Sequence, residues 1–267
     1  MLFPRALLGL AVLACAVPAV ADLSEVKSRG ALRVLVVGVR SGDEFFAPAG
    51  AQPGFDREVL EGFAGLQRVR LEVVRVSSWD ALIPDLLADR GDLIAGRFTV
   101  TESRKKLIAF TSEVFPTRNV VLTRRPHRVV RTIAELREEK VGTVKGTSLA
   151  EAVAAAGVPP ANVDSSVASG TLPAALKSGQ VGAVVLGVEN AISAQRADPA
   201  LQLGLFLGPP TSLAYGVRKG DAELLKVLDA YIENLRRTPT WSRLVVKYFG
   251  ERAPDVLRKA RTESTSP

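Results

Sequence analysis

Short apolar segments typical of strands alternate with segments of helical periodicity along the first part of the chain. In order, they predict a strand, a helix, a strand, a helix and a strand, over residues 31–39, 55–66, 69–73, 79–87 and 93–95. Gly30 precedes the first strand and ends a short predicted helix over 23–29. This alternation predicts right-handed crossovers and an α/β fold with mainly parallel strands.

A second α/β unit begins near Pro126. The pattern predicts its strands and the closing amphipathic helices over residues 140–144, 181–186, 213–217, 221–237 and 240–249. Two pairs, Thr132 with Glu135 and Ser148 with Glu151, have the spacing of a capping box and mark helix starts. The polar stretch over 258–267 is expected to be a disordered tail.

The first 21 residues have the pattern of an export signal. Arg5 is the only charge before a nearly wholly apolar run over 6–17, and Ala19-Val20-Ala21 has the small-x-small pattern of a cleavage site. We predict cleavage after Ala21. A membrane anchor is one alternative, but a spanning helix needs about 20 apolar residues. Cys15 lies in a loose approximation to a lipoprotein site, so a lipid-anchored form is a second alternative.

Composition excludes several classes of function. The 267 residues suffice for two lobes of roughly 100 to 120 residues each. Net charge is +7, but the basic residues are scattered and export makes nucleic acid a poor partner. The predicted mature chain has no cysteine and only one histidine, His127, which excludes disulfide scaffolds, thiol catalysis and multi-histidine metal sites. We therefore expect no cofactor, no metal and no catalytic residue.

Six short motifs occur in a fixed order along the chain. They are residues 23–34, Gly54-Phe55-Asp56, 79–84, 99–104, 141–147 and 215–221. Together they resemble the family 3 extracellular solute-binding proteins, of the type that serves amino-acid ABC transporters. The resemblance implies a type II periplasmic-binding-protein fold, with a discontinuous first lobe over 31–122 plus 213–250 and a second lobe over 123–212. Two crossing segments near 120–125 and 208–215 would form the hinge, and a ligand would lie between the lobes.

The resemblance gives Arg104 the leading role in ligand binding. The matching arginine of the family grips a ligand carboxylate, and a planar guanidinium suits this task because it donates two parallel charge-assisted bonds. Thr99 would add a hydroxyl, while Thr147 and Ser148 would offer a hydroxyl and backbone N–H groups from the second lobe. A solvated helix start for Arg104, and plain helix capping for Ser148, are the alternatives.

Aromatic residues are further candidates for the walls of the cleft. Phe45 and Phe46 follow the first strand in a loop, and we expect one of them to face the ligand. Trp79 is the third candidate. The alternative for all three is the hydrophobic core, where aromatic side chains are more often found.

Departures from the family pattern favour an acidic ligand. Gly187 stands where amino-acid binders of the family place an aspartate for the ligand's ammonium group, and Arg40 stands where they have another acid. With Arg97 and Lys145, these residues predict a strongly cationic cleft, which an anionic solute without a free α-ammonium would neutralise. Glu189, two positions after Gly187, is the main objection because it could restore the ammonium contact.

The sequence therefore predicts a periplasmic protein, expected to be a monomer, that captures a small carboxylate-bearing ligand for an inner-membrane ABC permease. Ligand-induced closure of the two lobes would be its mechanism. A periplasmic cyclohexadienyl-type dehydratase on the same fold is one alternative. A free-standing sensory or accessory binding module is the other.

Overall fold

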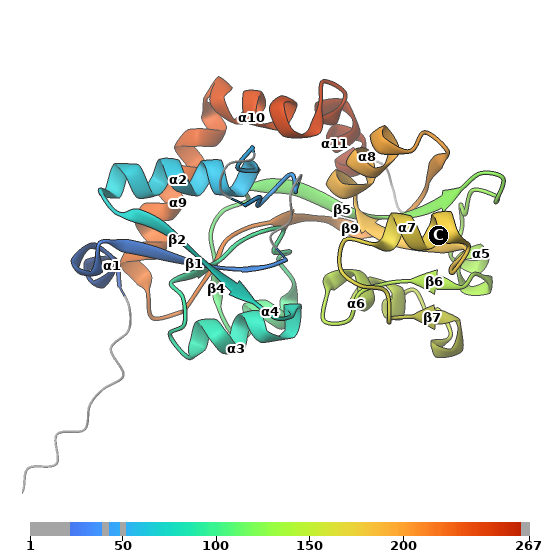
Figure 1. The fold of residues 1–267 in the computed structure, drawn as a ribbon, viewed down its shortest axis with the longest axis horizontal. Coiled ribbons are helices and arrows are strands. Elements are labelled where there is room, and N and C mark those ends of the chain that lie inside the picture. The colour runs from blue at the N-terminus through green and yellow to red at the C-terminus, as the bar shows by residue number, and fades with distance from the viewer. Residues whose placement is uncertain (1–21, 39–42, 49–51, 263–267) are drawn as a thin grey trace, which may run out of the picture.

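The computed structural model describes residues 22–38, 43–48 and 52–262. These residues form two five-stranded mixed sheets, each with its own helices, which we call the first and second lobes (Figure 1). The predicted signal segment and Arg40 lie outside the described residues. Among the described residues, no helix has both the length and the apolar character that crossing a membrane requires.

The first lobe is built around the sheet β2-β1-β3-β10-β4. Its strands are β1 (Ala31–Val37), β2 (Arg70–Val76), β3 (Leu93–Ile94), β4 (Ala109–Phe110) and β10 (Gly216–Val217). Its helical segments are α1 (Leu23–Arg29), α2 (Phe55–Gln67), η1 (Trp79–Ala81), α3 (Leu82–Leu87), α4 (Glu102–Lys105), α9 (Ala222–Arg237) and α10 (Pro239–Phe249). Strand β1 runs parallel to β2 and β3, whereas β10 runs antiparallel to both of its neighbours.

The second lobe is built around the sheet β7-β6-β8-β5-β9. Its strands are β5 (Phe115–Arg124), β6 (Val141–Gly142), β7 (Val163–Asp164), β8 (Ala183–Gly187) and β9 (Leu201–Leu213). Its helical segments are α5 (Ile133–Glu138), α6 (Ser148–Ala155), η2 (Pro160–Asn162), α7 (Leu172–Ser178) and α8 (Val188–Ala197). The predicted Thr132–Glu135 capping box is present at the start of α5. Each sheet contains both parallel and antiparallel pairs. In the first lobe β10 runs antiparallel to its neighbours, and in the second lobe β5 runs antiparallel to β8 and β9.

Strands β5 and β9 form a long antiparallel pair that reaches from the second lobe to the first (Figure 1). Their register runs from Phe115 opposite Leu213 to Arg124 opposite Leu201. Residues 115–122, which we expected in the first lobe, therefore belong to the second sheet, and the chain leaves the first sheet earlier than expected. The hydrophobic pattern predicted no strand over these residues, and the family resemblance implied only a crossing segment near 120–125. The predicted strand over 213–217 is likewise split between β9 and β10.

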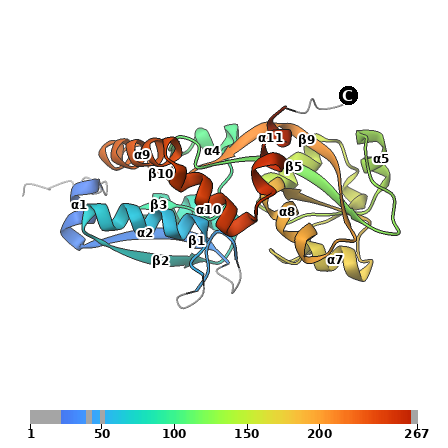
Figure 2. The same ribbon diagram turned by 90° about the horizontal axis from the view of Figure 1, so that it is seen from above.

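The last helix, α11 (Ala253–Thr262), overlaps the stretch that we expected to be disordered. That expectation was wrong over residues 258–262, and the rest of the stretch lies outside the described residues. Ala253, Leu257 and Ala260 recur at helical spacing and are buried. They pack against α8 and β5 of the second lobe, whereas α10 packs against α2 of the first (Figure 2).

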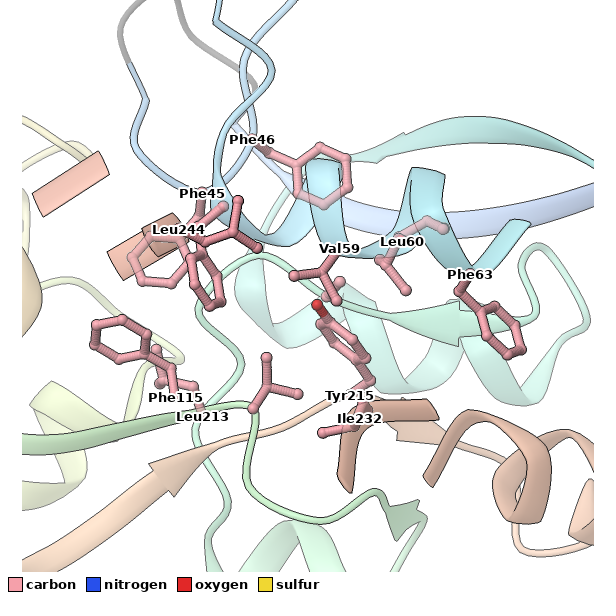
Figure 3. Close-up of a cluster of buried hydrophobic side chains, with 14 of the residues drawn as sticks. Phe45, Phe46, Val59, Leu60, Phe63, Phe115, Leu213, Tyr215, Ile232 and Leu244 are labelled. Carbon is pink, nitrogen blue, oxygen red and sulfur yellow. The ribbon is translucent and has the colours of Figure 1, made fainter. Parts of the chain in front are cut away.

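A cluster of phenylalanine rings ties the loop after β1 to α2, β5 and α10. Figure 3 shows Phe45 and Phe115 of this cluster. The ring centroids of Phe115 and Phe249 are 4.9 Å apart, and Phe45 lies 5.1 Å from Phe249 and 5.7 Å from Phe115. Phe55 completes the group at 5.3 Å from Phe115. This cluster lies where β5 leaves the first lobe, so it fixes the starting point of the crossing strand.

Candidate functional site

A cavity of about 700 Å³ lies between the two lobes. Its first-lobe wall contains Trp79, Arg97, Thr99 and Arg104. Thr117 and Asn119 of the crossing strand β5 line it as well, and α6, α7 and α8 provide the second-lobe wall. The cavity thus lies where the predicted fold would place a ligand.

Arg104 projects from the short helix α4, whose N-cap Thr101 accepts a bond from the Arg104 backbone N–H at 3.3 Å. Arg104 is 7% exposed, and its guanidinium stacks 4.3 Å from the centroid of Phe98. Nη1 donates to the Thr99 carbonyl at 2.8 Å, and Nη2 donates across the lobes to the Gly146 carbonyl at 3.4 Å.

The Arg104 charge has no ion-pair partner among the described residues. Burial lowers the pKa of Arg104 from its ordinary value, and the more distant charges of Glu151 and Asp80 oppose this shift. Arginine nevertheless stays protonated in proteins. A buried guanidinium without a carboxylate partner is costly, and a ligand carboxylate in the cavity would relieve that cost.

Thr99 and Ser148 meet across the cavity from opposite lobes, with the Ser148 hydroxyl donating to Thr99 Oγ1 at 3.0 Å. Thr147, not Ser148, caps helix α6, because its hydroxyl accepts the Ala150 N–H at 3.3 Å. The predicted Ser148–Glu151 capping box is therefore replaced by a Thr147 cap. Ser148 is the first helical residue, so the positive end of α6 faces the same space as Arg104.

Glu189 lies in the first turn of α8 and is 2% exposed. Thr117 donates to its carboxylate at 2.5 Å, and Asn190 donates at 3.3 Å. A β-carbon built on Gly187 would lie only 2.1 Å from Glu189 Oε1. The Glu189 carboxylate therefore occupies the space of a side chain at position 187, where amino-acid binders that this chain resembles have their aspartate.

The environment of Glu189 combines burial with several hydrogen bonds. Burial raises the pKa of Glu189 from its ordinary value, and nearby Glu44 adds to this rise. The bond from Thr117 and the charge of Arg97 oppose it. A ligand ammonium group at this carboxylate would favour the ionised form further.

Arg97 reaches the cavity wall from a left-handed backbone conformation, with φ of 67°. Asp56 holds this turn by accepting the backbone N–H groups of Gly96 at 3.0 Å and Arg97 at 3.2 Å. The Arg97 guanidinium forms an ion pair with Asp43 at 3.1 Å. Its charge is thus already neutralised by the protein.

The remaining expected site residues are placed differently. Phe45 and Phe46 are 0% and 3% exposed and belong to the first-lobe core rather than to the cavity wall, so the expectation of a ligand-facing ring there is corrected. Phe45 belongs to the phenylalanine cluster at the crossing strand, and Phe46 packs in the same apolar core. Lys145 is exposed and does not line the cavity. Trp79 does line it, and its indole Nε1 has no hydrogen-bond partner among the described residues.

The described wall of the cavity carries four basic and four acidic side chains: Arg97, Arg104, Arg124, Lys177, Asp43, Glu44, Glu189 and Asp198. The predicted strongly cationic cleft is therefore corrected to one with balanced charge. Sequence reasoning missed Asp43 and Glu44. Their position just after β1 could have revealed them, because the carboxyl ends of parallel strands line ligand sites in α/β folds.

Two α/β lobes that both line one cavity define a two-lobed ligand-binding protein. Residues 35–251 match the family of bacterial extracellular solute-binding proteins, family 3, and the chain belongs to this family. The family resemblance read from the sequence is confirmed.

Individual relatives include binding proteins and part of a larger protein. The L-arginine-binding protein of Pseudomonas aeruginosa is 27% identical over 76% of this chain and 81% of its own length. The membrane-bound lytic murein transglycosylase F of Stutzerimonas stutzeri is also 27% identical, over 86% of this chain, but the match spans only 48% of that protein. The arginine-bound form of a truncated ArgBP from T. maritima has a TM-score of 0.70 and 28% identity, covering 79% of this chain and 99% of that one. The likeness confirms the predicted type II fold.

Proposed function

We propose that this chain is a periplasmic amino-acid-binding protein, in which Arg104 holds the ligand carboxylate and Glu189 holds its α-ammonium group. The observation that carries this proposal is the pairing of a buried cation without a carboxylate partner and a buried carboxylate on the wall of one interlobe cavity. A zwitterion satisfies both groups, whereas a purely anionic solute would satisfy only Arg104. We therefore give up the hypothesis of an acidic ligand without an ammonium group.

Several polar groups would assist these two residues. Thr99 and Ser148 can turn their hydroxyls toward a carboxylate at Arg104, and the start of α6 adds a partial positive charge. Glu44 adds negative charge near Glu189. The names of the arginine-binding relatives agree with a ligand that carries both kinds of group.

Capture would be coupled to closure of the two lobes. Arg104 and Thr99 belong to the first lobe, while Ser148 and Glu189 belong to the second, so a ligand bound to both sets favours the conformation that brings them together. An inner-membrane ABC permease would then recognise the closed protein.

The test is calorimetric titration of the wild type with the common amino acids and with dicarboxylates. We expect at least one amino acid to bind. The variants Arg104→Gln and Glu189→Gln should each lose about 2 to 5 kcal/mol of binding free energy for it, because each leaves a charged ligand group buried and unpaired. Lys105→Ala is the matched control, because Lys105 follows Arg104 directly but is exposed and, among the residues that the structure describes, pairs only with Glu102.

Selective binding of dicarboxylates over every amino acid would overturn the proposed role of Glu189. Unchanged affinity in Arg104→Gln would overturn the whole site assignment. If chromatography of the reaction mixture shows that a bound carboxylate is converted to product, the chain is an enzyme and not a binding protein.

A further inference from the structure

The cavity extends beyond the two groups that would hold an amino-acid head. From Glu189 it continues along the groove between α7 and α8 as far as Ala197 and Asp198. At 1.5 Å of helix rise per residue, the eight steps from Glu189 to Ala197 span about 12 Å. An arginine side chain, six bonds long, extends only about 7 Å by ordinary backbone-like geometry. The groove is therefore longer than common amino-acid side chains.

The groove has an apolar lining. Leu186 of β8 and the buried Leu201 of β9 contribute to it, together with Leu172 at the start of α7. Its facing helices carry small residues, Ala174 on α7 and Ala194 on α8, which leave space between them. An extended aliphatic chain would fit this lining and would be stabilised by removing apolar surface from water.

One polar atom inside the groove lacks a partner. Ser193 Oγ is buried and has no hydrogen bond among the described residues. Buried hydroxyls are normally paired, so this one points to a ligand group that accepts or donates a hydrogen bond there. An amide or ester within an otherwise apolar chain provides such a group.

The far end of the groove is positively charged. Arg124 and Asp198 neutralise each other through an ion pair at 2.8 Å. Lys177, one turn after Ala174 on α7, is exposed; its charge acts on Asp198, but it forms no ion pair among the described residues. Its ammonium group is therefore available to an anionic group that arrives at this end.

We propose that the groove holds the side chain of the bound amino acid, and that this side chain is long, mainly apolar and terminated by an anionic group at Lys177. The ligand class is thus an α-amino acid with a second carboxylate at the end of an acyl-type spacer. This inference rests on the proposed amino-acid site, because the head must be held by Arg104 and Glu189.

Three probes separate the parts of the proposal in calorimetric titrations. L-Alanine carries the head alone, Nε-acetyl-L-lysine adds an apolar spacer and an amide, and Nε-succinyl-L-lysine adds the terminal carboxylate. We expect the acetylated probe to bind at least about tenfold more tightly than alanine, since each buried methylene adds affinity. The succinylated probe should gain about another fivefold, as for one partly exposed charge pair.

Two variants locate the effect. Lys177→Gln should remove the preference for the succinylated over the acetylated probe, whereas Lys226→Gln, an exposed lysine on α9, should keep it. Ala197→Trp should weaken both acylated probes by about tenfold or more while leaving alanine unchanged, because the indole would fill the groove.

The outcomes distinguish the two proposals. If none of the three probes binds although another common amino acid does, this inference fails and the amino-acid site stands; if no amino acid binds at all, both proposals fail. If alanine binds and the acylated probes bind no better, the groove is not a side-chain site, although the amino-acid site stands. A preference for the succinylated probe that survives Lys177→Gln overturns the role of Lys177.

Discussion

Glu189 takes the place of a side chain at position 187, and a single added methyl group tests this geometry. Gly187 has φ of −64°, so alanine there meets no backbone strain. Its β-carbon would lie 2.1 Å from Oε1, 2.7 Å from Cδ and 2.8 Å from Oε2 of Glu189. Gly187→Ala must therefore displace the carboxylate.

The cost of that displacement follows from the contacts of the carboxylate. Moving it breaks the 2.5 Å hydrogen bond from Thr117 and the weaker one from Asn190, both in a buried environment. Hydrogen bonds to charged groups contribute about 1.5 to 3 kcal/mol. We expect Gly187→Ala to lower the free energy of unfolding by about that amount and to weaken amino-acid binding.

Urea denaturation of a double-mutant cycle measures the effect. In a Glu189→Ala background, Gly187→Ala should cost only the small penalty of alanine at a helix N-cap, so the two substitutions should couple by about 1 to 2 kcal/mol. Gly65→Ala is the control, because nothing lies within 4 Å of its added β-carbon. Additive effects of the two substitutions would refute the reasoning.

Two further predictions concern the first lobe. Phe45→Ala should lower the free energy of unfolding by about 3 to 5 kcal/mol in chemical denaturation. The amino-acid affinity of the folded protein should change much less than in Arg104→Gln. A larger effect on affinity than on stability would show that Phe45 contributes to the binding site. Burial raises the pKa of Asp56 to about 6, so stability from its protonation is present below its ordinary pKa of 3.8 and is lost as pH rises through about 6. Relative to Asp56→Asn, the wild type should therefore lose up to about 3 kcal/mol between pH 4 and 6, and a pH-independent difference between the two would contradict this.

The hydrophobic pattern was sufficient for most elements of the fold. Strand β1, helix α2 and helix α10 lie within a few residues of their predicted bounds, because each buries one regular face. Pairing partners were harder to predict. The stretch over 115–124 mixes polar and apolar residues, and its pattern does not reveal that it pairs with β8 and β9.

The site was predictable where a motif fixes a residue relative to a helix start. Thr101 and Arg104 lie three residues apart, and the cap places the guanidinium at the cavity. Loop residues were not predictable in this way. Phe45 and Asp43 are close in the sequence, but one side chain turns into the core and the other toward Arg97, as their burial and contacts show.

The path of the C-terminal segment bears on how the lobes can move. Besides the strands β5 and β9, the chain passes from α10 on the first lobe to α11 on the second, which makes a third link between them. The carbonyl of Ala260 also accepts a bond from Arg118 of β5 at 3.3 Å. Two adjacent connections allow the lobes to twist as well as to bend relative to each other, but a third connection beside them resists twisting. The two lobes should therefore open mainly by bending about the β5–β9 pair.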